Sequence, residues 1–451
     1  MARRVGHVGG GQQVRGNRNE KAQARWGRYL CLKAWRALDG VGVLVLGTLA
    51  RRRTPAVAGA GPVCHVIHSL ELGGGQRQFL EFVRQEGRQG TTLVSLTDRS
   101  SPFSPAGDEV GVVQLYWAFR RNVVVHALAY LFPHTLFILA LWRQLQRWRP
   151  GCVWGWQFLA NVVAAPAARL AGVPRVVIRV ENLSAWKTWP PHKHWWNRWA
   201  DRNAARLADV VVVNARALVE DFAAWAGADR GKIVVVHNGV DAEGWLARPW
   251  QDRRPELGIA PGEVVVLTVG RLAREKNHEL LLRACTLLHQ RGLAHHLLLV
   301  GDGELRSVLE NRAQELGLGA WVHFVGATST PQDYYRSADV FALSSDIEGL
   351  PNALLEAQVF GLPAVTTAAG GAGEVVVDGE TGFVVPCGQV DELAAALGRL
   401  VADAQLRQRL GAAGQQRARR EFSRERWVRQ IEQLSFPQET AVLAEEAGAQ
   451  R

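Results

Sequence analysis

The sequence is poor in residues that bind metals or form disulfides. It has five cysteines among 451 residues, at positions 31, 64, 152, 285 and 387, and none forms a CxxC pair or stands at zinc-site spacing from a histidine. Scattered cysteines in an odd number are typical of a reducing compartment rather than of a disulfide framework. The Gly-Lys-Ser/Thr ending of a P-loop is absent, and so is an Asp-x-Asp pair that could hold Mg²⁺ between phosphates.

Acidic residues are nearly missing from the start of the chain. Residues 1–60 contain 12 Lys or Arg but only 2 Asp or Glu, so they carry almost all of the net charge of +11. This extension has little apolar surface to bury, and we expect it to be partly disordered. A solvated tail and an arm that lies on anionic lipid or nucleic acid are the alternative interpretations.

Long hydrophobic runs are also scarce. Residues 40–50 form an apolar segment that is too short to span a bilayer. The run Val123–Trp142 has 20 residues without Asp, Glu, Lys or Arg, which is long enough to span. However, Pro133 interrupts it and arginines flank both ends, so neither orientation is favoured. We therefore interpret it as a helix that is buried or lies on a membrane surface.

From Pro62 onward, short runs rich in β-branched residues alternate with helical segments. The first series includes "VCHVIHSL", "TTLVSLT", "CVWGWQ", "RVVIRVEN" and "KIVVVHNGVD", and the second runs from "VVVLTVGRL" to "GEVVVDGETGFVVP". Residues 241–263, rich in Pro, Gly and charge, look like a linker between them. This alternation predicts an α/β protein with two doubly wound parallel sheets. Ligands bind such sheets at the carboxyl ends of the strands, so two facing sheets predict an interdomain site.

Two cations follow the first strand of the second series. In "VGRLAREKN", Arg271 and Lys276 stand where they could bind a diphosphate, although solvated surface cations have the same pattern. A reaction that releases a diphosphate without a metal ion must offset its charge with such cations and with helix N-termini.

Two glutamates stand eight positions apart in "SSDIEGLPNALLEAQVFGLP". Glu348 precedes a helix whose free N–H groups could bind an anion or sugar hydroxyls, or it simply stabilises the helix dipole. Glu356 lies in an almost apolar helix, so its carboxylate needs a hydroxyl or cation partner, such as a ribose, unless it lies on a solvated face.

A glycine-rich turn, "LELGGGQRQFLEF", comes between the first strand and its helix. Its glycines Gly73, Gly74 and Gly75 could cradle a phosphate. The sequence "GDGELRSVLE" resembles half of a dinucleotide fingerprint, but the third glycine is missing and we interpret it as a tight turn.

The motifs "GRLAREKN", "GDGELRSVLE", "VHFVGAT", "SSDIEGLPNALLEAQVFGLPAV" and "GGAGEVVVDGETGFVVP" resemble, in order and spacing, those of family-4 retaining glycosyltransferases. "HNGVD" at residues 237–241 is similar too, and the resemblance covers about residues 62–434. It implies the GT-B fold: two Rossmann-like, doubly wound parallel-sheet domains that face each other across a cleft.

The resemblance also implies roles for single residues. Arg271 and Lys276 are similar to the pair that binds the donor diphosphate, Glu348 to the acid near the transferred sugar, and Glu356 to the acid that binds the ribose. The further binding residues that it implies are Gly349, Leu350 and Asn352 for phosphate and sugar, Phe324 to Gly326 for the base, and Gly74 and Gly75 for the diphosphate and acceptor.

The first domain departs from the family at one strand end. Where many relatives carry a histidine near the reacting sugar, this sequence has Glu181 and Asn182. Either residue could contact the acceptor, and either could be a turn residue. No histidine role is assigned.

The run Trp186–Arg202 holds five tryptophans among Lys, Arg and His. Such surfaces suit lipid headgroups and sugars, although a Trp-rich packing loop has the same composition. Nothing in it forms the repeated platform of a nucleic-acid-binding protein. With the basic extension and the Val123–Trp142 helix, it suggests the hypothesis of a cytoplasmic protein in peripheral contact with the anionic cytoplasmic face of the inner membrane.

Taken together, the residues and the resemblance predict an enzyme that moves a sugar, with retention and without metal or cofactor, from a nucleotide-sugar to a hydroxyl acceptor. A UDP-sugar is the favoured donor, and a lipid-linked saccharide or a cell-surface polysaccharide precursor the favoured acceptor. An epimerase, a phosphorylase and a non-catalytic nucleotide-sugar-binding protein are the alternatives. We expect the extension at 1–60, domains at 61–245 and 246–420, a helix at 421–436 that crosses back to the first domain, and a tail at 437–451.

Overall fold

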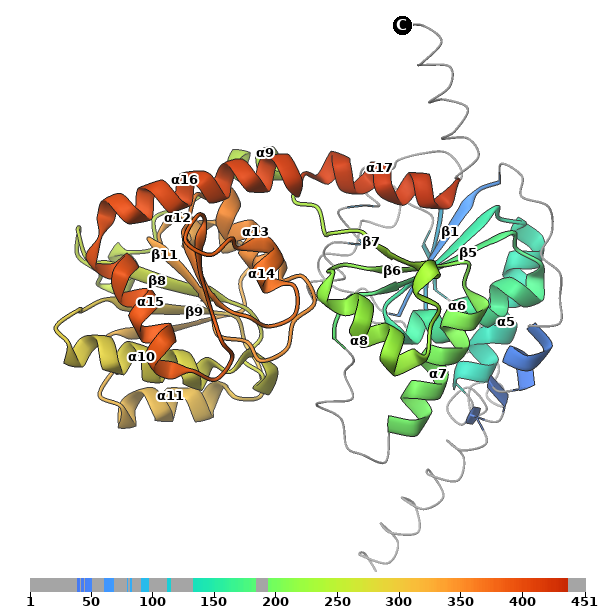
Figure 1. Ribbon diagram of the computed structural model, residues 1–451, viewed down its shortest axis with the longest axis horizontal. Coiled ribbons are helices and arrows are strands. Elements are labelled where there is room, and N and C mark those ends of the chain that lie inside the picture. Colours follow the sequence, from blue (N-terminus) through green and yellow to red (C-terminus); the bar gives the residue numbers. More distant parts are fainter. Residues whose placement is uncertain are drawn as a thin grey trace, which may run out of the picture.

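Two parallel β-sheets, each with helices on both faces, form two domains that lie side by side (Figure 1). The computed structural model describes residues 39–40, 42–43, 45–50, 61–68, 79, 82, 91–96, 112–114, 133–183 and 194–436. The predicted class, an α/β protein with two doubly wound Rossmann-like domains, is confirmed.

The first sheet has seven parallel strands in the order β3-β2-β1-β4-β5-β6-β7. Its strands are β1 (Val63–Ile67), β2 (Thr91–Ser95), β3 (Val112–Gln114), β4 (Cys152–Trp156), β5 (Arg175–Val180), β6 (Val210–Val213) and β7 (Ile233–Val235). Its helices are α5 (Pro133–Trp148), α6 (Phe158–Ala171), α7 (His194–Leu207), α8 (Ala217–Ala226) and the 3₁₀ turn η3 (Arg230–Lys232).

This sheet is buried on both faces, which is why its strands read as continuous apolar runs. Alternate residues of β1 enter different cores: Cys64 and Val66 pack with α5 and α6, whereas Val63 and Ile67 pack with Phe79 on the other face. The period of two in a strand therefore builds both layers from one five-residue segment.

The second sheet has six parallel strands in the order β10-β9-β8-β11-β12-β13. Its strands are β8 (Val265–Val269), β9 (His296–Val300), β10 (Val322–Gly326), β11 (Val340–Leu343), β12 (Ala364–Thr367) and β13 (Gly382–Val385). Its helical segments are η5 (Arg274–Lys276), α10 (His278–Gln290), α11 (Arg306–Glu315), α12 (Pro331–Arg336), α13 (Asn352–Val359), α14 (Ala372–Val375), α15 (Val390–Ala402) and α16 (Ala404–Glu421).

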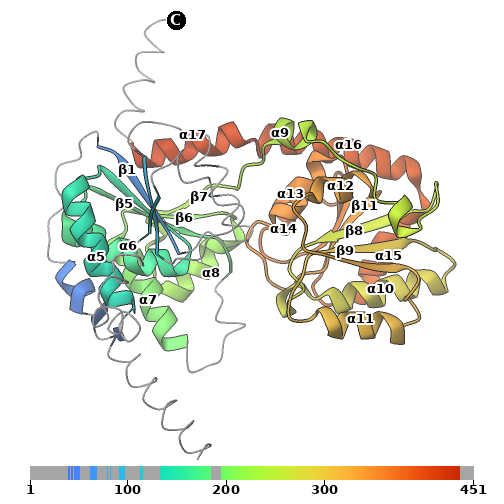
Figure 2. The same cartoon turned by 180° about the vertical axis from the view of Figure 1, so that it is seen from behind.

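The chain crosses between the domains twice, and the two crossings lie side by side. The first leads from β7 to α9 (Ala242–Ala247), and the second from α16 to α17 (Arg424–Ser435). The Val240 amide donates to the Phe422 carbonyl at 2.8 Å, and the Arg424 amide donates to the Val240 carbonyl at 3.2 Å. Figure 2 shows α17 lying over the first domain and α16 over the second.

Helix α17 is part of the first domain's core although it comes last in the described chain. Trp427 and Ile431 are buried there, and the Trp154 indole N–H donates to Ser435 Oγ at 2.8 Å. The last helix of the described chain therefore packs on the first domain.

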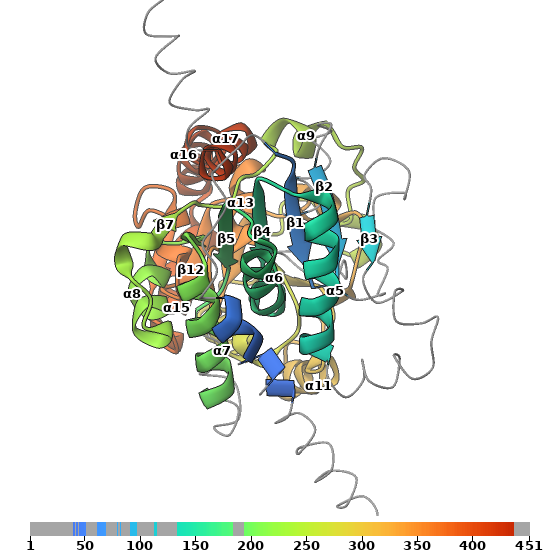
Figure 3. The ribbon, with the colours of Figure 1, turned by 90° about the vertical axis from the view of Figure 1, so that its right-hand side faces the viewer.

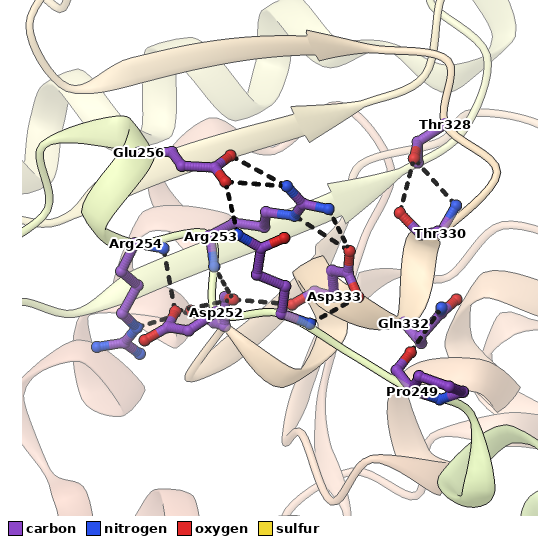
Figure 4. Close-up of polar contacts among 11 residues, drawn as sticks. Pro249, Asp252, Arg253, Arg254, Glu256, Thr328, Thr330, Gln332 and Asp333 are labelled. Carbon is purple, nitrogen blue, oxygen red and sulfur yellow. Dashed lines mark hydrogen bonds and ion pairs between the residues drawn. The ribbon is translucent and has the colours of Figure 1, made fainter.

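The segment 241–263 joins the two sheets, but it has secondary structure of its own and is bound to the second domain. It contains α9 and the 3₁₀ turn η4 (Pro255–Leu257). The Arg253 guanidinium donates to Asp333 Oδ2 of α12 at 2.6 Å and also contacts Glu256 (Figure 4). These contacts attach the second half of the linker to the second domain.

Only the second half of the apolar run Val123–Trp142 is described by the structure. Residues 123–132 lie outside the described residues, and the remainder forms the first part of α5, which begins at Pro133. The buried carboxylate of Asp39 accepts hydrogen bonds from the amides of His134 and Thr135, and so caps α5. Among the residues that the structure describes, no helix is both long and apolar enough to cross a bilayer.

The tryptophan-rich run is split in the same way. Residues 184–193 lie outside the described residues, and the rest belongs to α7. The rings of Trp196 and Trp199 stack at 5.1 Å and pack against the core, whereas Trp195 is 67% exposed. Figure 3 shows the segment 39–50, in blue, beside α7.

Candidate active site

The two domains meet where the carboxyl ends of their strands face each other. We call this region the interdomain seam. It comprises residues 181–182, 214–217 and 237–238 of the first domain and residues 348–352 and 370–374 of the second. The seam is the place that the doubly wound topology predicts for a ligand.

The closest backbone contact in the seam involves Gly349. It forms an antiparallel bridge with Asn182, and a Cβ atom at position 349 would lie 1.8 Å from the Glu181 carbonyl oxygen. A side chain at position 349 would therefore push the domains apart. Asn182, predicted as an acceptor contact, lies at the seam through its backbone, and its side chain is exposed.

Lys276 and Glu348 form an ion pair beside the seam. Lys276 Nζ lies 2.6 Å from Glu348 Oε1, and the hydroxyl of Ser345 donates to the same oxygen at 2.6 Å. The side chains are only 22% and 7% exposed, so each charge depends strongly on the other. The structure thus joins two predicted site residues that are 72 positions apart.

Arg271 is placed differently. Its guanidinium pairs with Glu275, four residues further along its own loop, and its side chain is 65% exposed. It lies on the same loop as Lys276 but does not contact Glu348 in this arrangement. The guanidinium is thus exposed to solvent and paired only within its own loop.

Glu356 is buried, and its partner is a hydroxyl. The Tyr335 phenol donates to Glu356 Oε2 at 2.8 Å, from α12 to α13. Both side chains are almost fully buried. The sequence predicted that this carboxylate needs a hydroxyl or cation, and the structure supplies a tyrosine from the protein itself.

A chain of buried polar side chains leads from the first sheet to the start of α13. The Arg179 guanidinium donates to Glu181 Oε1 at 3.2 Å and to Asn238 Oδ1 at 2.6 Å. The Asn238 amide in turn donates to Asn352 Oδ1 at 2.6 Å and to the Leu350 carbonyl at 3.3 Å. This chain holds the predicted site residues Asn352 and Leu350 against the first domain.

Arg179 is fully buried between aromatic rings. Its guanidinium lies over Trp156 at 5.1 Å and over Trp427 at 5.7 Å. Burial lowers its pKa, and the neighbouring Glu181 carboxylate opposes that shift. Glu181, one of the two polar residues at this strand end, thus serves here as the counter-ion of a buried cation.

Phe324 and Gly326 end the edge strand β10. Arg306 Nη2 donates to the Phe324 carbonyl at 3.1 Å, and the Gly301 amide donates to the Gly326 carbonyl at 2.9 Å. A Cβ atom at Gly301 would lie 1.9 Å from the Gly270 carbonyl oxygen. The GDG turn therefore connects this strand end to the Arg271 loop, which agrees with a tight turn rather than a dinucleotide fingerprint.

Other predicted elements bear on the site less directly. Gly74 and Gly75 lie outside the described residues. His278, which begins α10 beside Lys276, is buried, and burial lowers its pKa to about 4, so it is neutral at pH 7. Among the described residues, no three His, Cys, Asp or Glu side chains are grouped so that they could hold a metal ion.

Sequence reasoning missed Arg179, Asn238, Tyr335 and Glu374, all of which contribute polar contacts at or near the seam. Asn238 lies within the "HNGVD" motif, so its motif was a signal. Arg179, in the middle of an apolar strand, was a second signal, because a buried charge needs partners.

Family models match both halves of the chain. The model described as Glycosyltransferase Family 4 matches residues 72–243, and the model described as Glycosyl transferases group 1 matches residues 251–417.

Curated relatives agree. The chain is 31% identical over 308 residues to the GDP-mannose-dependent alpha-(1-6)-phosphatidylinositol monomannoside mannosyltransferase of Mycolicibacterium smegmatis, covering 65% of this chain and 78% of that protein. It is 28% identical over 348 residues to the Vi polysaccharide biosynthesis protein VipC/TviE of Salmonella typhi, covering 74% of this chain and 56% of the relative, so it spans little more than half of that protein.

Solved structures show the same fold. The Anabaena protein HepE in complex with UDP-glucose has a TM-score of 0.69 at 22% identity, covering 82% of this chain and 98% of that chain. The sucrose-phosphate synthase of Thermosynechococcus elongatus has a TM-score of 0.68 at 22% identity, covering 85% and 100%. With two facing parallel-sheet domains, motifs in family order and matches to both halves, the chain belongs to the family-4, group 1 type of GT-B glycosyltransferases, enzymes that transfer a sugar from a nucleotide-sugar.

Proposed function

We propose that this protein is a retaining, metal-independent glycosyltransferase that moves a sugar from a UDP-sugar to a hydroxyl of a lipid-linked saccharide or polysaccharide precursor. The observation that carries the proposal is the Lys276–Glu348 pair, held at the seam beside the start of α13. A cation, a carboxylate and the positive end of a helix dipole at one place suit a phosphate that carries a sugar.

The reaction depends on stabilising the departing diphosphate. Lys276 and the exposed Arg271 supply positive charge, and the N-terminus of α13 supplies the positive end of its dipole. Glu348 orients Lys276 and accepts hydrogen bonds from the sugar hydroxyls. Glu356, in the same helix, binds the ribose through the carboxylate oxygens that Tyr335 helps to orient.

The choice of uridine as the donor base rests on the similar proteins rather than on the geometry of the site. HepE, a structural neighbour, was solved with UDP and with UDP-glucose, whereas one sequence relative is named for GDP-mannose. Isothermal titration with UDP, GDP and ADP, followed by a donor screen, tests the choice. We expect UDP to bind most tightly; a clear preference for GDP would overturn the UDP assignment.

The reaction class has its own tests. We expect turnover to survive EDTA, and activity that vanishes under EDTA and returns with Mn²⁺ would contradict the metal-independent mechanism. Product formation from donor alone, without acceptor, would instead indicate an epimerase. The anomeric configuration of the product, read by NMR, tests retention.

Glu356 offers a residue-specific test. Glu356→Ala should weaken nucleotide-sugar binding by about 1–3 kcal/mol through the loss of a charged hydrogen bond. Unchanged donor affinity in titration calorimetry would remove the ribose role.

We also propose that the first domain touches an anionic membrane. Five large apolar side chains are exposed among the described residues, and three of them, Val45, Leu49 and Trp195, lie on the segment 39–50 and on α7, which pack together. Arg51, Arg52 and Arg53 follow this segment in the sequence. Apolar side chains next to clustered arginines suit an anionic bilayer surface.

Liposome flotation with anionic vesicles tests this contact. Val45→Glu and Leu49→Glu should reduce binding, whereas Val308→Glu, at a similarly exposed valine of the second domain, should not. Removal of residues 1–60 should reduce binding further. Vesicle binding that none of these changes alters would exclude this surface, and equal binding to nucleic acid would point to another partner.

A further inference from the structure

The start of α8 lacks a capping residue of its own. The residue at its N-cap, Arg216, makes no side-chain cap hydrogen bond. Ser, Thr, Asp and Asn are preferred at this position because their side chains satisfy the first free amides. Here the acceptor comes from the other domain: Glu374 Oε2 accepts from the Arg216 amide at 2.9 Å, and Oε1 accepts from the Ala217 amide at 3.0 Å.

The same carboxylate has a third partner on the first domain. His237 Nε2 lies 2.8 Å from Glu374 Oε2, just after β7 and just before the first crossing between domains. Within the second domain, Arg417 Nη2 donates to the Glu374 carbonyl at 3.0 Å and so attaches α14 to α16. Glu374 therefore connects the start of α8 and the loop after β7, both in the first domain, to α14 of the second domain, which is itself attached to α16.

Hydrogen bonds from the first domain favour the ionised acid in this position. The Glu374 side chain is 17% exposed. Burial alone would raise its pKa, but the hydrogen bonds from His237 and from the two amides lower it below the ordinary value. The carboxylate is thus charged at neutral pH and interacts favourably with the positive end of the α8 dipole.

The backbone near Glu374 is shaped for close approach. The Gly371 amide donates to the Gly349 carbonyl at 2.7 Å, and a Cβ atom at Gly371 would lie 2.5 Å from Ala215 Cβ of the first domain. The turn that carries Glu374 therefore touches both the loop before α8 and the loop that carries Glu348.

We propose that Glu374 is a positioning residue that holds the seam closed by capping α8 across the domain boundary. Closure brings residues 181–182 against Gly349, next to the Lys276–Glu348 pair. Glu374 does not itself contact these side chains, so it acts through the relative position of the domains. The inference goes beyond the proposed function, because it holds for any sugar, base or acceptor.

The test compares Glu374→Ala and Glu374→Gln with Glu380→Ala, a matched control at an exposed glutamate six residues further along. Three quantities are measured: UDP affinity by calorimetry, kcat and KM with the donor found by screening, and the radius of gyration by small-angle X-ray scattering. We expect Glu374→Ala to lower kcat about tenfold, since small misplacements of reacting groups are costly. The radius of gyration should rise and UDP affinity should change little, because the nucleotide contacts proposed among the described residues lie in the second domain.

The kcat and the radius of gyration of Glu374→Gln should fall between those of Glu374→Ala and the Glu380→Ala control, because the glutamine amide oxygen can still accept a hydrogen bond from one backbone amide. A native kcat and a native scattering curve in Glu374→Ala would overturn the proposal, and so would a loss of thermal stability alone. Scattering needs no substrate, so a wrong donor assignment would leave this readout intact and would be recognised separately.

His237→Ala provides a second route if Glu374→Ala does not fold. It removes one partner of Glu374 and leaves both amides of α8 in place, so we expect a smaller change in the same direction. If Glu374→Ala does fold, the loss of kcat in the variant that combines it with His237→Ala should be close to that of Glu374→Ala alone, because both residues act through one contact. Fully additive losses would show that the two residues act independently and would contradict the proposal.

Discussion

At the scale of single residues, polar side chains at or near the seam are paired with partners distant in sequence. Lys276 meets Glu348, Tyr335 meets Glu356, and Asn238 meets Asn352. The sequence predicted Lys276, Glu348, Glu356 and Asn352 from motif and chemistry. It could not supply most of the partners, because a pairing between distant positions is visible only once the sheets have brought the strand ends together.

The Lys276–Glu348 pair allows stability and catalysis to be separated. Lys276→Ala should destabilise the protein by about 3–5 kcal/mol, because Glu348 would keep a largely buried charge without its cation. The double variant Lys276→Met with Glu348→Gln should regain much of that stability but not the donor affinity. Urea denaturation and calorimetry measure the two effects. Donor affinity at the native level in the double variant would contradict the diphosphate role.

Tyr335 tests the buried hydroxyl contact with Glu356. Tyr335→Phe keeps the ring stacked on Phe360 but removes the phenolic donor. We expect a loss of about 1–2 kcal/mol in the free energy of unfolding. The adjacent Tyr334→Phe serves as a control, with little expected change. Equal stability in the two variants would mean that the hydroxyl contributes nothing to the site.

At the scale of elements, the alternating strands and helices were predictable, whereas boundaries and partners were not. The apolar runs from "VCHVIHSL" onward became buried parallel strands because their side chains are apolar on both faces. The run Val123–Trp142 was expected as one helix, but the described part begins at Pro133, which suits a first helical turn. The composition of 241–263 indicated a linker but not its contacts: Arg253 binds Asp333, which lies 80 residues further along the chain.

Several elements bury neutral histidines, and this predicts how stability changes with pH. Burial lowers the pKa of His65 in β1 to about 3, and that of His278 in α10 and His295 before β9 to about 4. Their unfolded pKa is about 6.5, so the unfolded state binds more protons below that value. The stabilisation is therefore fully present above about pH 6.5 and is lost as the pH falls towards 4.

The free energy of unfolding, measured by urea denaturation between pH 7 and pH 4.5, should decrease accordingly. At pH 5 the decrease should be up to about 2 kcal/mol per histidine. His278→Asn should show a shallower dependence than the native protein. An NMR titration in which the folded His278 ring takes up a proton near pH 6.5 would contradict the burial effect.

At the scale of the whole molecule, α17 attaches the second domain's last segment to the first domain. Trp427 is almost fully buried there and packs against Phe82, Trp156 and Arg179. Trp427→Ala should destabilise the protein by about 3–5 kcal/mol, as deletion of a large buried aromatic does. Trp250→Ala, at a 47% exposed tryptophan, is the control. A Trp427→Ala midpoint in urea that matches the control would show that α17 is not part of this core.

The double crossing also means that the first domain is made from two separate stretches of chain, whereas the second domain is one continuous stretch. A single break in the backbone near residue 245 would yield a first fragment without the helix that covers its aromatic core, and a second fragment carrying that helix with nothing beneath it. Each piece would then hold an exposed apolar surface that only the other can cover. Two such fragments, produced separately and mixed, should reassemble into a working enzyme, which would make this protein a natural starting point for split-reporter designs.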